Sequence, residues 1–262
     1  MLKYVLFTFL IPISISAQKS ESFIYSYYFQ LDSTDVNHSG EDVMLLEVKG
    51  EKSIFHSVYT LEANLFYFGN QEQIMVSGLD LINNPKPRLE YAIHANLKND
   101  SLEIFQDYIT YKFQYYEQNP EIVWKIENEQ KPYMDYTVQK AATTFKGRKY
   151  IAWFTPEIPI SSGPYKFKGL PGLIVEIYDP KKTHHFKLIE VGSKIKIPED
   201  YFRNYSIITK KDFEDFLHRY RTDIYGGLPE GSVRFSEEDE RRLKENMEER
   251  NRKRNNPIEL ED

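Results

Sequence analysis

The chain has no cysteine among its 262 residues. This absence excludes disulfides, thiolate metal sites and cysteine nucleophiles, so the fold must be stabilised by packing alone. Basic residues are not in excess either. The formal net charge is −6 at pH 7, which gives the chain no electrostatic reason to bind nucleic acid. A phosphate-binding glycine loop is also absent, since the Gly-Leu-Pro-Gly run at Gly169 lacks the lysine and the following helix that such a loop needs.

Long apolar runs are scarce, and the one that stands out lies at the N-terminus. A charged start at Lys3 precedes an apolar stretch from Tyr4 to Ile15, and Ser16-Ala17 follows it. This pattern predicts a signal peptide over residues 1–17, cleaved after Ala17. A buried strand or a membrane anchor is the alternative, but a helical span needs ~20 apolar residues. We therefore expect an exported protein, periplasmic or associated with the outer membrane or extracellular, and not an integral membrane protein.

Aromatic residues are abundant, with 20 tyrosines and 17 phenylalanines, and they favour strands. Short connections between sequential strand-like segments favour an antiparallel arrangement over a parallel sheet, which would need helical crossovers. About nine or ten strands are expected, and sheets of that size tend to curl or split. The sequence thus predicts a mainly β (α+β) fold: a large curved antiparallel sheet or partly open barrel over a single domain, residues 18–235. We expect a loop at Asp32–Asp42, and either a short helix or a loop at Leu61–Gly78.

The C-terminal part predicts one or two helices. Thr209 opens the first, whose apolar stripe at Phe213, Phe216, Leu217 and Tyr220 should dock on the sheet. Ser236 followed by Asp239 resembles a capping box. Because charges fill most of the positions beyond it, residues 236–262 predict a charged helical or disordered tail. Glu237–Glu249 should make few core contacts, so truncation after Ser236 should change the melting temperature little.

The most constrained stretch runs from Trp153 to Asp179. It carries four prolines and three glycines within twenty residues, interleaved with apolar side chains. Prolines at that spacing exclude a helix. We expect an ordered loop packed on the sheet, which delivers the chain into a strand at Leu173–Tyr178. Its Pro171-Gly172 dipeptide fits a type II turn, with a positive φ at Gly172.

Two interpretations of this loop compete. As a recognition element it would present a ligand- or partner-binding surface; as a structural crossover its glycines would allow close backbone packing, which we favour. The candidate binding residues are Tyr165, Phe167, Gly169, Leu170, Pro171, Gly172, Leu173 and Ile174.

Gly169-Leu170-Pro171-Gly172-Leu173-Ile174 resembles the signature of the GLPGLI family. The stretches 140–148, 152–160 and 256–260 are also similar to that family, while Val138 stands where many members carry a cysteine. The resemblance implies an exported protein of the Bacteroidetes kind, of unestablished function. It further implies genes beside TonB-dependent outer-membrane transporters, so a transporter or its cargo is the expected partner.

Few residues suggest chemistry. His184 and His185 are adjacent, and on a strand they would point to opposite faces, so a shared metal ion is disfavoured. Ser161 and Ser162 lack a nucleophile elbow. We therefore expect no catalytic residue, no metal and no cofactor, and a non-enzymatic binding or accessory protein of the cell envelope. The alternative is a periplasmic hydrolase that uses Glu157, Glu176 and His185, which would require these side chains to converge.

Overall fold

The structure is a computed structural model that describes residues 20–68, 89, 91–108, 111–119, 121–229 and 231–261. The predicted signal peptide lies outside the described residues. Only the first part of the ambiguous Leu61–Gly78 segment is described, and it belongs to a helix, α1 (Val58–Phe68).

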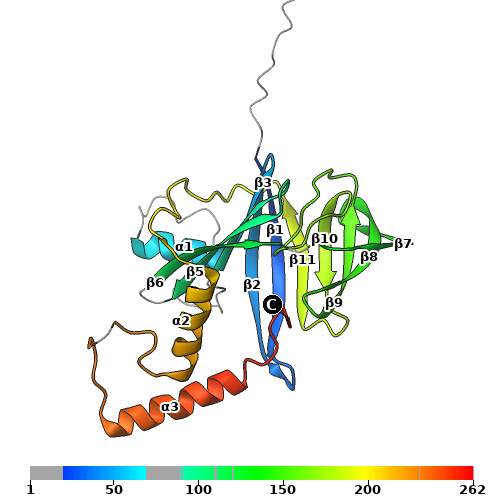
Figure 1. Cartoon of the computed structure of the whole chain (residues 1–262). Coiled ribbons are helices and arrows are strands. Elements are labelled where there is room, and N and C mark those ends of the chain that lie inside the picture. Colours follow the sequence, from blue (N-terminus) through cyan, green and yellow to red (C-terminus); the bar gives the residue numbers. More distant parts are fainter. Residues whose placement is uncertain are drawn as a thin grey trace, which may run out of the picture.

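Twelve strands form one sheet in the order β12-β6-β5-β4-β3-β2-β1-β11-β10-β9-β8-β7. Their bounds are β1 Glu21–Asp32, β2 Asp35–Lys49, β3 Lys52–Ser57, β4 Tyr91–Asn96, β5 Ser101–Tyr108, β6 Tyr111–Gln118, β7 Lys125–Tyr133, β8 Tyr136–Phe145, β9 Arg148–Thr155, β10 Leu173–Tyr178, β11 His184–Val191 and β12 Ser206–Ile207. Every pairing is antiparallel except that of β12 with β6. Figure 1 shows β7–β10 curling on one side of β1, and β4–β6 fanning out on the other. The predicted mainly β fold with a curved, open sheet is confirmed.

The expected loop at Asp32–Asp42 is wrong. Most of it belongs to β2, which pairs with β1 from Glu21↔Val48 to Asp32↔Asp35. A strand side chain that faces solvent can be polar without cost, and this end of the hairpin is largely exposed. The composition of the segment therefore resembles that of a loop although Asp35 and Ser39–Asp42 pair with β1, on either side of an irregularity.

Two helices follow the sheet: α2 (Lys210–Thr222) and α3 (Glu237–Arg252). Thr209 caps α2 through a reciprocal capping box with Asp212, and Phe216 of its apolar stripe packs on the ring of Phe113 in β6 at 4.8 Å. Ser236 caps α3 as predicted. No residue of α3 is buried, and the helix lies away from the sheet in Figure 1.

The main core lies on one face of the sheet and includes residues of β1–β6 and of β8–β11. Tyr27 of β1 stacks on Phe186 of β11 with ring centroids 3.8 Å apart, and each fully buried aromatic ring contributes roughly 1.5–3 kcal/mol. The polar groups described below are set into this aromatic face. Among the described residues, no helix combines the length and apolar character needed to cross a membrane.

Candidate functional site

The loop between β9 and β10, residues 156–172, contains most of the signature, and we call it the signature loop. Together with the start of β10, it is largely part of the core. Phe167, Leu170, Leu173 and Ile174 are at most 1% exposed, and the Phe167 ring packs at 4.7 Å on that of Tyr150. Among the eight candidate binding residues, Gly169 and Pro171 are exposed and Tyr165 is half-buried, whereas the rest are buried. Tyr165 is thus the one candidate side chain with a polar group that can meet a ligand.

Both glycines of the signature have positive φ, at +95° for Gly169 and +152° for Gly172. The predicted positive φ at Gly172 is confirmed, but the predicted type II turn is wrong. The Gly172 amide donates to the Leu170 carbonyl at 2.8 Å, which closes a three-residue turn centred on Pro171. A Cβ atom on Gly172 would lie 2.1 Å from the carbonyl oxygen of Thr155. Close backbone approach to β9 therefore fixes glycine here.

Side chains from outside the loop hold its backbone in place. Asn119 Nδ2 donates to the Lys166 carbonyl at 2.9 Å, and Trp124 Nε1 donates to the Lys168 carbonyl at 2.8 Å. Tyr165 has a φ of +59°, a conformation that costs a non-glycine residue on the order of 1–3 kcal/mol. The loop thus holds Tyr165 in a strained conformation, with its hydroxyl directed at another part of the chain.

That other part is the C-terminal segment, residues 255–261, which returns from α3 across the sheet (Figure 1). Asn256 anchors it and is 8% exposed. Its backbone amide donates to the Leu31 carbonyl at 3.1 Å, and its side-chain Nδ2 donates to the Gln30 carbonyl at 2.7 Å. Asn256 therefore pairs with the end of β1 much as a short strand would.

Side chains on β9 and β11 donate to three successive carbonyls of the segment. His184 Nε2 lies 3.1 Å from the Asn256 carbonyl oxygen. Arg148 Nη2 donates to the Pro257 carbonyl at 2.6 Å and to Asn256 Oδ1 at 2.8 Å. The Tyr150 hydroxyl donates to the Ile258 carbonyl at 2.7 Å. Donors that recognise backbone carbonyls in series read an extended main chain.

Glu259, the next residue of the C-terminal segment, contacts the signature loop through its side chain. Its Oε1 accepts from the Tyr165 hydroxyl at 2.6 Å and lies 2.8 Å from Lys166 Nζ. Lys166 is 8% exposed and also pairs with Glu117 of β6. The ammonium group is thus buried between two carboxylates, one from the sheet and one from the tail. We call Arg148, Tyr150, Tyr165, Lys166 and His184 the tail groove.

The protonation state of His184 follows from its surroundings. Burial lowers its pKa to about 4, and the nearby Arg148 adds to the effect, so the ring is neutral near pH 7. A carbonyl only accepts, so Nε2 carries the proton toward Asn256. Nδ1 then accepts from the Tyr27 hydroxyl, 2.7 Å away. Tyr27 in β1 in this way fixes the tautomer that faces the tail.

The tail groove was not predicted from the sequence. Arg148 follows a hairpin turn in which Lys146 and Gly147 have φ of +47° and +74°, as a type I′ turn requires. The turn itself does not fix the direction of the Arg148 side chain. The available signal was that residues 140–148 and 256–260 both resemble the same family, since two conserved-looking stretches can be partners in space.

The residues considered for catalysis converge only in part. Glu176 Oε1 lies 2.9 Å from His185 Nε2, and Glu176 Oε2 lies 2.7 Å from Lys131 Nζ. Despite its burial, hydrogen bonds from these two partners lower the Glu176 pKa to about 2. Glu157 lies apart and accepts from the Thr137 amide at 2.7 Å. His184 and His185 face different partners, as adjacent strand residues should. Among the described residues, no group of three or more histidine and acidic side chains could hold a metal ion.

Comparisons with known proteins give a family segment and a fold. Residues 106–176, from β5 to β10, match a family described as a protein of unknown function (Porph_ging). No curated protein sequence matches the chain. A structure of PNGF-II in space group P21 is similar over 78% of this chain and 34% of its own, with 15% identity and a TM-score of 0.54.

A second structure of PNGF-II, in space group C2, gives similar values: 77% of this chain, 33% of that chain, 15% identity and a TM-score of 0.52. The chain therefore spans about a third of the PNGF-II chain. At this level of identity the likeness shows a shared fold alone. The segment that matches the family of unknown function contains Arg148, Tyr150, Tyr165 and Lys166, which are most of the tail groove.

Proposed function

We propose that this protein is a non-enzymatic binding protein whose tail groove recognises an extended peptide with a carboxylate side chain. The observation that carries the proposal is the alignment of donors from His184, Arg148 and Tyr150 along three successive carbonyls. Recognition through main-chain groups supplies affinity, and the pocket for one side chain supplies specificity. The protein's own C-terminal segment is the peptide that fills the groove.

An empty groove would be costly, which favours a permanent occupant or an exchange of occupants. The side chain of Arg148 is 11% exposed, and the side chain of Lys166 is 7% exposed. A buried donor left without an acceptor costs about 1–3 kcal/mol, and more when it is charged. A partner that displaces the tail must therefore offer carbonyls and a carboxylate at the same positions.

The expected export by residues 1–17 belongs to the same proposal. In the cell envelope, an outer-membrane transporter or its cargo would supply the displacing segment, in line with the GLPGLI resemblance. A periplasmic hydrolase that uses Glu176 and His185 is the second candidate, favoured by their 2.9 Å contact. We prefer the binding function because both oxygens of Glu176 are already paired, with His185 and with Lys131.

The test uses the full chain with a weakened tail, Asn256→Ala combined with Glu259→Gln. A fluorescent peptide of residues 254–262 should bind this variant, as read by polarisation, and should bind the wild-type chain about tenfold more weakly because the tail competes. A peptide with Glu259→Gln should bind poorly to either chain. Adding Arg148→Met to the weakened chain should remove binding.

Leu260, which is 54% exposed, provides the control, since a peptide with Leu260→Ala should bind as tightly as the unchanged peptide. A folded, tail-weakened chain that does not bind the peptide would overturn the proposal. Envelope proteins captured by the tail-weakened chain count as partners only if the 254–262 peptide releases them.

A further inference from the structure

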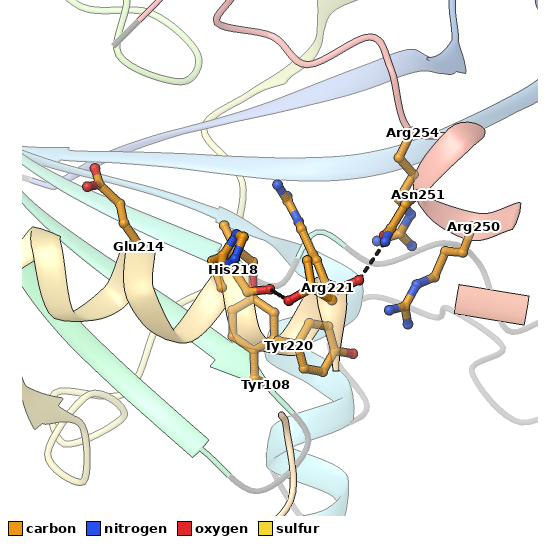
Figure 2. A pocket seen from close by; sticks show the side chains of 10 residues that line it. Tyr108, Glu214, His218, Tyr220, Arg221, Arg250, Asn251 and Arg254 are labelled. Atoms are coloured by element: carbon orange, nitrogen blue, oxygen red, sulfur yellow. Dashed lines mark hydrogen bonds between the residues drawn. The ribbon is translucent and has the colours of Figure 1, made fainter. Parts of the chain in front are cut away.

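A second candidate site lies away from the tail groove, where the C-terminal ends of α2 and α3 meet. Asn251 Nδ2 of α3 donates to the Arg221 carbonyl of α2 at 2.6 Å. Next to this contact is a cavity of about 410 Å³. Figure 2 shows the side chains that line it, with α2 and the end of α3 on its two sides.

Positive charge gathers in this cavity. Arg221 comes from α2, Arg250 from α3 and Arg254 from the turn after it, while Glu214 is the acid in the lining. None of these three arginines makes an ion pair with another described residue. The same helices do pair other basic side chains, as in Lys211–Asp215 at 2.8 Å and Lys253–Glu249 at 2.6 Å. In an acidic chain, these three guanidinium groups leave a local excess of positive charge at one cavity.

Arginine at the end of a helix has a simpler role, which is to offset the negative end of the helix dipole. Here, however, two of the last carbonyls of α2 already have other donors. The Asp223 amide donates to the Arg219 carbonyl at 2.8 Å, and Asn251 donates to the Arg221 carbonyl. The guanidinium groups are therefore available to a ligand, and the satisfied carbonyls repel an anion less.

The floor of the cavity is aromatic. The rings of Tyr108 and Tyr220 lie 5.2 Å apart, edge to face, and the Arg250 guanidinium lies over the Tyr220 ring at 5.3 Å. Such stacking restrains the planar guanidinium group, so that less conformational freedom is lost when it binds an oxyanion. Carbon atoms attached to the anion would lie against the tyrosine rings.

We propose that this cavity binds a phosphate group, with Arg221, Arg250 and Arg254 as its donors. Guanidinium groups match phosphate oxygens with paired hydrogen bonds, whereas lysine acts as a point charge. A soluble phosphate ester and the phosphate of a lipid headgroup present the same chemistry here. None of its lining residues belongs to the tail groove, although Arg254 directly precedes the segment that fills the groove.

The first experiment is calorimetry on the full chain with inorganic phosphate and then glycerol phosphate, at matched ionic strength in chloride. We expect saturable binding, with glycerol phosphate tighter because its carbons reach the tyrosines. The double variant Arg250→Gln with Arg254→Gln should weaken binding at least about tenfold. The matched control is Arg241→Gln with Arg242→Gln, which removes the same charge from exposed positions of α3 and should leave binding unchanged.

Vesicles separate the two sources of phosphate. Sedimentation with phosphatidylglycerol vesicles, but not with phosphatidylcholine vesicles, supports a lipid headgroup if the cavity variant loses it and the control keeps it. Binding of glycerol phosphate without vesicle binding supports a soluble ester. No saturable binding of either phosphate, or equal losses in the cavity and control variants, would overturn the proposal. Should the glutamine variant fail to fold, Arg250→Lys with Arg254→Lys keeps the charge and should still weaken binding.

Discussion

The hydroxyl of Tyr165 donates a 2.6 Å hydrogen bond to the carboxylate of Glu259, which lies 94 positions later in the chain. This contact joins the signature loop to the C-terminal segment. It also explains why a strained backbone at Tyr165 is retained, since the strain directs the hydroxyl at the tail.

The Tyr165–Glu259 pair should be energetically coupled. In a double-mutant cycle with Tyr165→Phe and Glu259→Gln, we expect a coupling free energy of about 1.5 kcal/mol or more, as for other hydrogen bonds to charged groups. Urea unfolding of the four proteins measures it. Tyr225→Phe, which removes a bond to Glu240, should show no coupling with Glu259→Gln. A coupling near zero for Tyr165 would mean that the tail is not docked in solution.

The tail should stabilise the fold. A chain that ends at Lys253 removes the acceptor of the Tyr150 hydroxyl, the carbonyl acceptor of Arg148 and one of the two carboxylates at Lys166. We therefore expect a loss of about 3 kcal/mol, or roughly 6–12 °C in melting temperature. The expectation from the sequence that truncation after Ser236 changes the melting temperature little considered the charged helix, and α3 indeed has no buried residue. It did not account for the docked segment that follows α3. Leu260→Ala, at a 54% exposed position, is the calorimetric control and should change little. An unchanged melting temperature after truncation would contradict the docked tail.

Gly172 of the signature and Gly192, which follows β11, should differ in how well they tolerate alanine. Gly172→Ala would place Cβ against the Thr155 carbonyl, and we expect a loss above about 3 kcal/mol. Gly192 has a φ of +78° with no atom within 4 Å of the added Cβ, so Gly192→Ala should cost only the left-handed strain of about 1–2 kcal/mol. Denaturant midpoints of the two variants compare these costs. Equal losses would show that β9 can move away.

Stability should fall as the pH drops from about 6.5 toward 4. Burial lowers the pKa of His56 to about 3, and those of His94 and His184 to about 4. The unfolded chain takes up these protons near its ordinary value of about 6.5, whereas the folded chain does so only near its lowered values. The stabilisation is thus complete above about pH 6.5 and is lost as the pH falls from 6.5 toward the lowered pKa values.

We expect a loss of about 1–2 kcal/mol per histidine between pH 7 and pH 5. Glu176, with a pKa lowered to about 2 by hydrogen bonds that outweigh its burial, loses its contribution only in stronger acid. Urea midpoints measured at each pH should fall less steeply for His184→Gln. Exposed His218→Gln is the matched control and should keep the wild-type slope. A wild-type midpoint that does not change over this range would contradict neutral buried histidines.

The sequence alone determined the strands, the two helix caps and the need for glycine in the signature. These features follow from local rules: aromatic alternation along a strand, side-chain oxygens that accept from the first turn of a helix, and backbone conformations that a Cβ disfavours. Thr209 and Ser236 cap α2 and α3 as expected. Local rules failed at Asp35–Asp42, where a polar composition resembles a loop although Asp35 and Ser39–Asp42 pair with β1.

The tertiary structure alone decided the tail groove. Asn256 bonds to Gln30 across 226 positions, and Arg148 bonds to Asn256 across 108. No periodicity links residues so far apart, because their meeting depends on the strand order of the whole sheet, which brings β1 beside β11 and leaves β9 within reach of the tail. The sequence could suggest that Tyr165 and residues 256–260 each matter. Only the folded chain shows that they contact each other.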